Sequence, residues 1–127
     1  MQKSPTESEL EILEILWEYG QCTVRSVHEH LEQKGKNVRY TTTLKMMQIM
    51  TQKGFLSRIT DERTHTYSPV LQSGATRNAL ITRMANTAFG GSAMKLVLQA
   101  LGNQRTTPEE LKEIRDYLDK LEKEQQM

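Results

Sequence analysis

The sequence predicts a mainly α-helical protein with one small β-hairpin. Three short amphipathic segments come first, two short strand-like segments follow by residue 69, and further helical segments fill the rest of the 127 residues. The composition, 36% hydrophobic and 26% charged, is that of an ordinary soluble globular domain. No apolar run reaches the roughly 18 residues that a membrane helix needs, so we expect no membrane insertion.

Cysteine usage and the first residues indicate the compartment. Cys22 is the single cysteine, which excludes an intramolecular disulfide framework and a cysteine-rich zinc site. The opening stretch MQKSPTESEL lacks the apolar core of a signal peptide. We therefore expect a protein of the reducing cytoplasm.

The first two helices are marked by their N-terminal caps. Thr6 and Glu9 have the spacing of a capping box for a helix over about residues 7–19, which Gly20 ends. The apolar residues of this segment are too many for one face, so we expect it to pack on two sides. Thr23 is the expected N-cap of a second helix.

A third helix and a hairpin complete the first half. The helix is predicted from Thr41 to Gln52, with Gly54 as its stop. Phe55–Ile59 and His65–Ser68 have the composition of short strands, and the polar stretch Thr60–Thr64 is the expected hairpin tip. Three short helices followed by a hairpin is the order of a winged helix-turn-helix.

The second half is predicted to be helical. Ser73 and Ser92 are expected helix starts, with Gly90 and Gly102 as stops. The last helix has the clearest start signal, because Thr107 takes the N-cap, Pro108 the first helical position and Glu110 the third. Its apolar residues form an a/d seam of nearly two heptads, too short to hold a coiled coil alone. The seam consists of Leu111, Ile114, Leu118 and Leu121.

Charge is distributed unevenly, although the net charge is only +1. Residues 7–18 carry five glutamates and no base, whereas residues 34–63 carry seven bases against two acids. A basic segment of this kind is typical of a surface that binds a polyanion, although charge runs are also common on solvated faces. The bases are Lys34, Lys36, Arg39, Lys45, Lys53, Arg58 and Arg63.

The third predicted helix separates into two faces. One has core spacing, at Thr43, Met46, Met47 and Met50. The other is a polar stripe of Thr41, Lys45, Gln48 and Gln52, residue types that contact DNA bases and phosphates. We expect Arg58 and Arg63 to lie near the tip of the wing and to contact the phosphate backbone or the minor groove. The expected DNA-binding residues are Arg39, Tyr40, Thr41, Thr42, Lys45, Gln48, Gln52, Arg58 and Arg63.

The sequence lacks a recognisable catalytic constellation. His28 and His30 are two residues apart on a helix, so they point in different directions and cannot jointly hold a metal. Cys22 is expected to be a small packed residue. No glycine-rich phosphate loop follows a predicted strand. We expect no cofactor, no metal site and no enzymatic activity.

Apolar faces of the second half predict assembly. A winged domain closes its own small core, so these faces need another partner, and a twofold homodimer would present two reading helices to a pseudo-palindromic DNA operator. We therefore divide the chain into a DNA-binding domain, residues 1–72, and a helical dimerisation arm, residues 73–127. The expected dimerisation residues are Leu80, Met84, Leu96, Val97, Leu101, Leu111, Ile114, Leu118 and Leu121.

Three alternatives stay open at this point. The arm helices could fold back on the winged domain of the same chain. The winged fold could be a protein-interaction module without sequence-specific DNA binding, since fold does not fix function. The chain could also be a repressor that senses a small molecule through a pocket in the arm.

An ordered set of segments resembles the penicillinase-repressor family of the BlaI/MecI type. The segments are Thr6–Trp17, Cys22–Arg25, Tyr40–Leu44, Gln52–Leu56, Thr66–Pro69, Phe89–Ser92 and Thr107–Leu111. The resemblance covers residues 6 to about 121 in the right order. It implies a dimeric winged-helix repressor of resistance or stress genes.

The resemblance also implies an inducing route. In well-known members a membrane sensor-protease pathway relieves repression by cutting the dimerisation arm at an Asn-Phe bond. The matching place reads Leu98-Gln99-Ala100-Leu101, so the cleavage region falls at Gln99 and Ala100 but lacks the expected pair. The paired cysteine tail of the copper-responsive relatives is also missing from the sequence.

Overall fold

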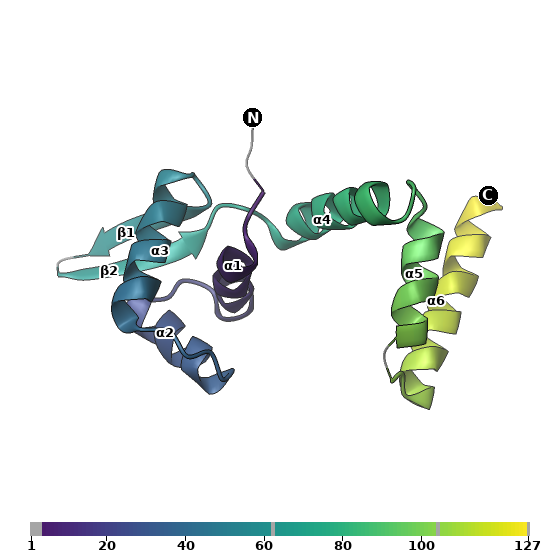
Figure 1. The fold of residues 1–127 in the computed structure, drawn as a ribbon, viewed down its shortest axis with the longest axis horizontal. Coiled ribbons are helices and arrows are strands. Elements are labelled where there is room, and N and C mark those ends of the chain that lie inside the picture. The colour runs from purple at the N-terminus through teal and green to yellow at the C-terminus, as the bar shows by residue number, and fades with distance from the viewer. Residues whose placement is uncertain (1–3, 62, 104, 127) are drawn as a thin grey trace. The chain divides into compact units, whose positions relative to one another are not determined.

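The computed structural model describes residues 4–61, 63–103 and 105–126. The elements follow in the order α1, α2, α3, β1, β2, α4, α5 and α6 (Figure 1). This mainly helical order with one antiparallel hairpin confirms the predicted fold class. The chain forms two compact units, Met1–Asn78 and Ala79–Met127.

Helix α1 (Glu7–Tyr19) begins at the predicted capping box. The Glu9 backbone N–H donates to Thr6 Oγ1 at 3.2 Å, and the Thr6 N–H donates to Glu9 Oε1 at 2.9 Å. Four apolar residues on one broad face of α1 are at most 1% exposed, and the helix packs on α2, α3 and β2. The four residues are Ile12, Leu13, Ile15 and Leu16.

Helices α2 (Val24–Gln33) and α3 (Tyr40–Gln52) follow as predicted, with α3 starting one residue earlier than expected. Thr23 Oγ1 caps α2 by accepting from the Ser26 N–H at 3.1 Å. Gly54 adopts a φ of 84°, a left-handed conformation that glycine tolerates, and the chain turns there from α3 into the hairpin.

The hairpin is longer than predicted. Strands β1 (Leu56–Asp61) and β2 (Thr64–Pro69) pair antiparallel, with Thr60 opposite His65 and Asp61 opposite Thr64. Most of the predicted polar tip, residues 60–64, is therefore strand, because these polar residues still satisfy backbone pairing on an exposed hairpin. Within that stretch, Glu62 lies outside the described residues.

A short bridge between Cys22 and Tyr67 adds a third segment to the hairpin. The Cys22 N–H donates to the Tyr67 carbonyl at 3.0 Å, and the Tyr67 N–H donates back to the Cys22 carbonyl at 2.8 Å. The turn before α2 is thereby fixed to β2. Cys22 is buried, as predicted for a small packed residue.

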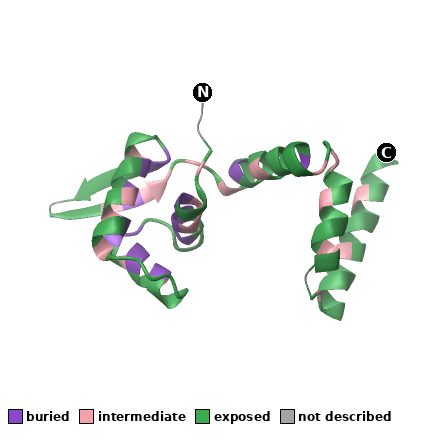
Figure 2. Ribbon diagram, in the orientation of Figure 1, coloured by how far each residue is buried: buried purple, intermediate pink, exposed green. Residues whose placement is uncertain are grey.

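The core of the first unit lies between α1, α2, α3 and the base of the hairpin (Figure 2). Tyr67 brings β2 into this core, and Phe55 and Leu56 bring in the start of β1. The remaining buried members are Ile12, Leu13, Ile15, Leu16, Cys22, Val24, Val27, Leu31, Met47 and Met50.

Met47 on α3 gives a direct test of this core. Met47→Ala is expected to lower the free energy of unfolding by about 2–5 kcal/mol, because a fully buried side chain is lost and a cavity remains. Ile49→Ala on the same helix, where Ile49 is 38% exposed, should cost clearly less. Urea unfolding of both variants makes the comparison, and equal losses would place Met47 outside the core.

The second unit is helical, from within α4 (Ser73–Ala88) through α5 (Ala93–Asn103) and α6 (Pro108–Gln125). Ser73 is the first residue of α4, and Ser92 Oγ accepts from the Lys95 N–H at 3.1 Å at the start of α5. The predicted capping box of α6 is present, with Thr107 Oγ1 accepting from the Glu110 N–H at 3.1 Å.

The first residues of α4 belong to the first unit and pack against it. Thr76 is buried, and the Arg77 guanidinium lies 5.3 Å from the Trp17 ring centroid. The Trp17 indole N–H donates to the Leu71 carbonyl at 2.8 Å. These contacts fix the segment that leads from β2 into α4.

Candidate nucleic-acid interface

Helix α3 presents the two faces that its sequence predicts. Thr43, Met47 and Met50 are buried, and Met46 is half-buried. Every residue of the predicted polar stripe is exposed, namely Thr41, Lys45, Gln48 and Gln52. The apolar face holds the helix on the core, which leaves the stripe free for a ligand.

A groove lies between the stripe and the hairpin. Gln48 and Gln52 line it from α3, and Ser57 and Arg58 line it from β1. Arg58 pairs in register with the buried Tyr67, so both side chains share the hairpin face that looks toward this groove. Polar groups of the helix and the wing therefore converge on one surface.

The two wing arginines occupy different places. The sequence suggested that both lie near the hairpin tip, but Arg58 lies within β1 and lines the groove. Arg63 directly precedes β2 at the tip and is exposed. Arg58 lies three positions before the last residue of β1, inside the paired part of the hairpin, whereas Arg63 lies outside both strands.

At the N-terminal end of α3 the aromatic ring of Tyr40 is half-buried. The Arg25 guanidinium lies 4.9 Å from its centroid, and the His28 ring meets it edge-on at 5.6 Å. Arg39 and Thr42 beside it are exposed. Arg25 is not among the residues predicted to bind DNA, although it is a base in the first turn of α2, the helix that precedes the expected reading helix.

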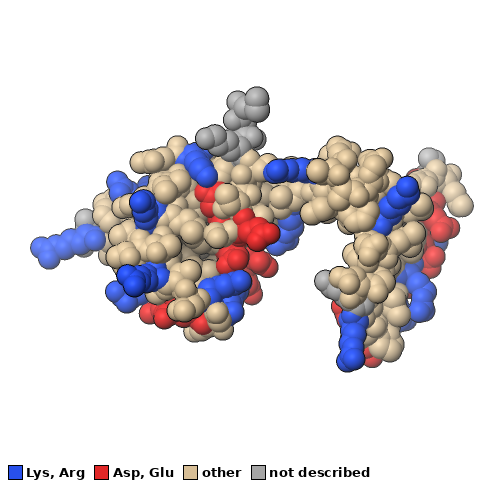
Figure 3. Space-filling model, viewed as in Figure 1, with Lys and Arg blue, Asp and Glu red and all other residues tan. Residues whose placement is uncertain are grey.

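Two of the seven bases in residues 34–63 are paired with acids of α1. Lys36 Nζ lies 3.3 Å from Glu11 Oε1, and Lys53 Nζ lies 2.8 Å from Glu9 Oε2. The other five make no ion pair among the residues that the structure describes; they are Lys34, Arg39, Lys45, Arg58 and Arg63. Lys and Arg side chains gather over the hairpin and α3, and acidic side chains gather around α1 (Figure 3).

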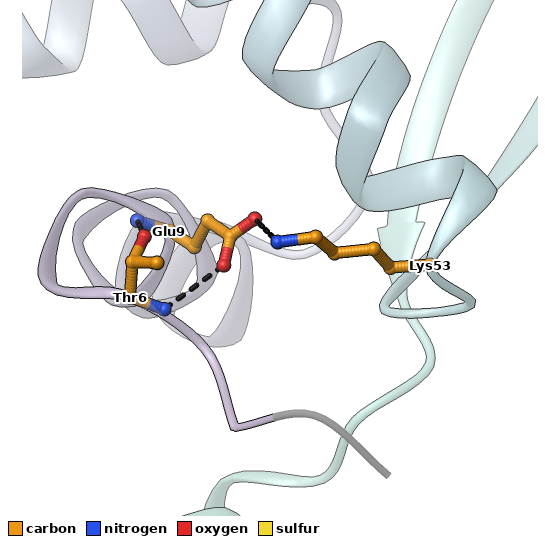
Figure 4. Close-up of polar contacts among 3 residues, drawn as sticks. All are labelled: Thr6, Glu9 and Lys53. Atoms are coloured by element: carbon orange, nitrogen blue, oxygen red, sulfur yellow. Dashed lines mark hydrogen bonds and ion pairs between the residues drawn. The ribbon is translucent and has the colours of Figure 1, made fainter. Parts of the chain in front are cut away.

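Glu9 is the buried acid of this unit. Burial acts to raise the pKa of its carboxyl, but hydrogen bonds from Lys53 and Thr6 and the charge of Lys53 outweigh burial and lower the pKa below its usual range. The carboxylate is therefore charged at neutral pH. Figure 4 shows it between the start of α1 and the end of α3, with both oxygens engaged.

The histidines have structural partners. His28 is buried, with Nδ1 3.0 Å from Thr43 Oγ1, so it joins α2 to the buried face of α3. His30 stacks on Tyr19 with ring centroids 4.1 Å apart. Across the described residues, no three His, Cys, Asp or Glu side chains group as metal ligands would.

In the second unit the predicted dimerisation residues form exposed or half-exposed apolar surface. Four of them are exposed in a single chain, including Met84 at 53% and Leu118 at 51%. Among the residues described, neither α5 nor α6 contains a buried one. Gln99 and Ala100 lie exposed inside α5, where a protease would have to unwind the helix to reach an extended chain. Besides Met84 and Leu118, the predicted dimerisation residues are Leu80, Leu96, Val97, Leu101, Leu111, Ile114 and Leu121.

Three helices, a hairpin and an exposed polar stripe on α3 define a winged-helix protein of the DNA-binding class. The penicillinase repressor family model matches residues 5–120, and the chain belongs to this family. The name of the family is that of a transcriptional repressor, and the curated relatives are transcriptional regulators. No helix within the described ranges is long and apolar enough to cross a membrane.

Part of the chain is similar to two relatives from Mycobacterium tuberculosis. Both are described as transcriptional regulator BlaI, one from strain CDC 1551 / Oshkosh and one from strain ATCC 25618 / H37Rv. Each is 35% identical over 60 residues, which is 46% of this chain. The match spans 43% of the relatives' own length.

Proposed function

We propose that this protein is a transcriptional repressor that binds a pseudo-palindromic operator as a homodimer. The observation that carries the proposal is the convergence of Gln48, Gln52 and Arg58 on one groove beside exposed Lys45. Gln and Lys read base edges in the major groove, and Arg suits both phosphate and guanine. Arg39 and Thr42 stand at the N-terminal end of α3, the end that enters the groove in this motif.

The dimer follows from the apolar surface of the second unit. Among described residues α5 and α6 bury no side chain, while Val97, Leu98 and Leu118 are about half or more exposed. Exposed apolar surface of this kind is usually covered by a partner, and a twofold partner is the commonest for a soluble chain. Two copies of α3 would then read two half-sites.

Occupancy is the proposed mechanism of repression. The dimer bound over a promoter would exclude the transcription machinery, and opening of the dimer would release it. We infer from the family that the regulated genes are resistance or stress genes. We also infer that the regulator acts in the cytoplasm. A membrane sensor-protease pathway is a proposed partner, although Gln99-Ala100 replaces the bond that such a pathway cuts in other members.

A DNA titration tests the proposal. The purified protein is titrated onto DNA from just upstream of its own coding region and onto unrelated DNA, at two salt concentrations. We expect the upstream DNA to bind at least about a thousandfold more tightly, and both affinities to fall as salt rises. Equal weak binding to both would favour the protein-interaction alternative. A lack of binding at low salt would overturn the assignment of α3 as a DNA-reading helix.

A further inference from the structure

Lys53 belongs by sequence to the basic segment of residues 34–63, but its ammonium group is paired with an acid of the same unit. It is the C-cap residue of α3, and its backbone N–H donates to the Ile49 carbonyl at 2.9 Å. Its side chain is 28% exposed and its Nζ donates to Glu9 Oε2 at 2.8 Å. Among the described residues this is the ion pair that joins α1 to the end of α3 (Figure 4).

Glu9 is held from both sides. Its side chain is 4% exposed, one oxygen accepts from the Thr6 N–H and the other from Lys53. A carboxylate so far removed from water is costly unless it is paired, so its position constrains the position of Lys53. The capping box fixes Glu9 to the first turn of α1, and α1 is part of the core.

Packing holds the buried face of α3 along its length, and the Glu9–Lys53 ion pair adds a charged contact at its C-terminal end. Thr43 bonds to His28 near the start of the helix, and Met47 and Met50 pack in the core. Gln52 is adjacent to Lys53 in sequence, and Gln48 lies one turn earlier on the same exposed stripe. A change in the last turn of α3 would therefore move the two glutamines that line the groove.

We propose that Glu9 and Lys53 are a positioning pair that fixes the last turn of α3 for DNA reading, and that Lys53 lies outside the DNA-contacting surface. This inference rests on the proposed function, in that the surface being positioned is the operator-reading stripe. The bases that bind phosphate are then those without acidic partners in the described structure, such as Lys45 and Arg63.

The test compares two glutamates of α1 in the full-length protein. Glu9→Gln removes the buried charge but keeps an amide oxygen for the Thr6 N–H. Glu11→Gln removes the partner of Lys36 in a surface pair whose side chains are 46% and 35% exposed. Both variants change the net charge equally, so a general charge effect on DNA binding is matched between them.

We expect Glu9→Gln to weaken binding to the upstream DNA by about three- to tenfold, with binding to unrelated DNA unchanged. Glu11→Gln should leave both affinities unchanged, because exposed pairs contribute little. Lys53→Gln should weaken specific binding by a similar factor without altering the salt slope. The double variant Glu9→Gln/Lys53→Gln should be no weaker than either single variant.

Opposite results would overturn the inference. If Lys53 contacts phosphate, Lys53→Gln lowers the salt slope by about 0.9 per contact and weakens binding to unrelated DNA as well. An unchanged preference in Glu9→Gln, with the wild type still preferring the upstream DNA, would show that the pair does not position the stripe. A wild type without preference would instead overturn the proposed function.

Amide hydrogen exchange in the free protein provides a readout that needs no DNA. Glu9→Gln is expected to lower protection about tenfold over residues 50–54, the last turn of α3 and the two residues after it, and to leave residues 44–47 protected. Glu11→Gln serves as the control again. Uniform loss of protection along α3 would mean that Glu9 acts through global stability, which would contradict a positioning role.

Discussion

A variant in which Lys45 and Gln48 are both alanine is expected to bind operator DNA no better than unrelated DNA while it remains dimeric. Both side chains are exposed on α3, and a good contact to a base edge discriminates by about 1–3 kcal/mol. Two contacts in each of two protomers would amount to about 4 kcal/mol or more, which is roughly a thousandfold in affinity. Competition binding against unrelated DNA measures the ratio directly.

A matched control exists at the end of the chain. Lys123 and Gln126 have the same residue types and the same spacing, and both are exposed. Replacing them by alanine should leave operator preference unchanged, since they lie far along the chain from the stripe. A Lys45→Ala/Gln48→Ala protein that still selects its operator would show that α3 is not the reading helix.

A charge placed in the apolar seam of α6 is expected to have the second large effect. Leu118→Glu puts a carboxylate where 51% of the leucine is exposed in a single chain, and a twofold interface would bring two such charges together. Sedimentation equilibrium should then show a monomer. Operator affinity should fall at least about a hundredfold, because each monomer holds only one half-site.

Lys120→Glu is the control for this substitution, because Lys120 is an exposed residue of α6 outside the seam. It should leave the protein dimeric. Circular dichroism of both variants checks that the helices persist. If Leu118→Glu still dimerised at the concentration at which the wild type does, the apolar seam of α6 would not be part of the dimer interface.

Much of the fold could be predicted from short-range chemistry. The caps at Thr6, Thr23 and Thr107 were recognised because a side-chain oxygen must satisfy the N–H groups of a first helical turn within three residues. The buried face of α3 followed from helical periodicity, since the period decides which side chains share a face.

Contacts between distant segments could not be predicted in this way. The Cys22–Tyr67 bridge depends on the path of the hairpin back past the turn before α2. The hairpin tip was misjudged because strand pairing depends on a partner across the turn more than on the polarity of the residues. The sequence pattern does not separate Arg58 from Arg63, whereas the register of Arg58 with Tyr67 puts Arg58 in the groove.

The helix starts, the order of a winged helix-turn-helix and the polar stripe on α3 can be predicted from local sequence, because all three depend on residues a few positions apart. Which charges remain available to a ligand depends on long-range packing. Lys53 and Arg58 look alike in a charge count, yet one is held against Glu9 and the other lines the groove beside Gln48. Whether a charge faces a ligand or an internal partner depends on neighbours that packing brings from elsewhere in the chain.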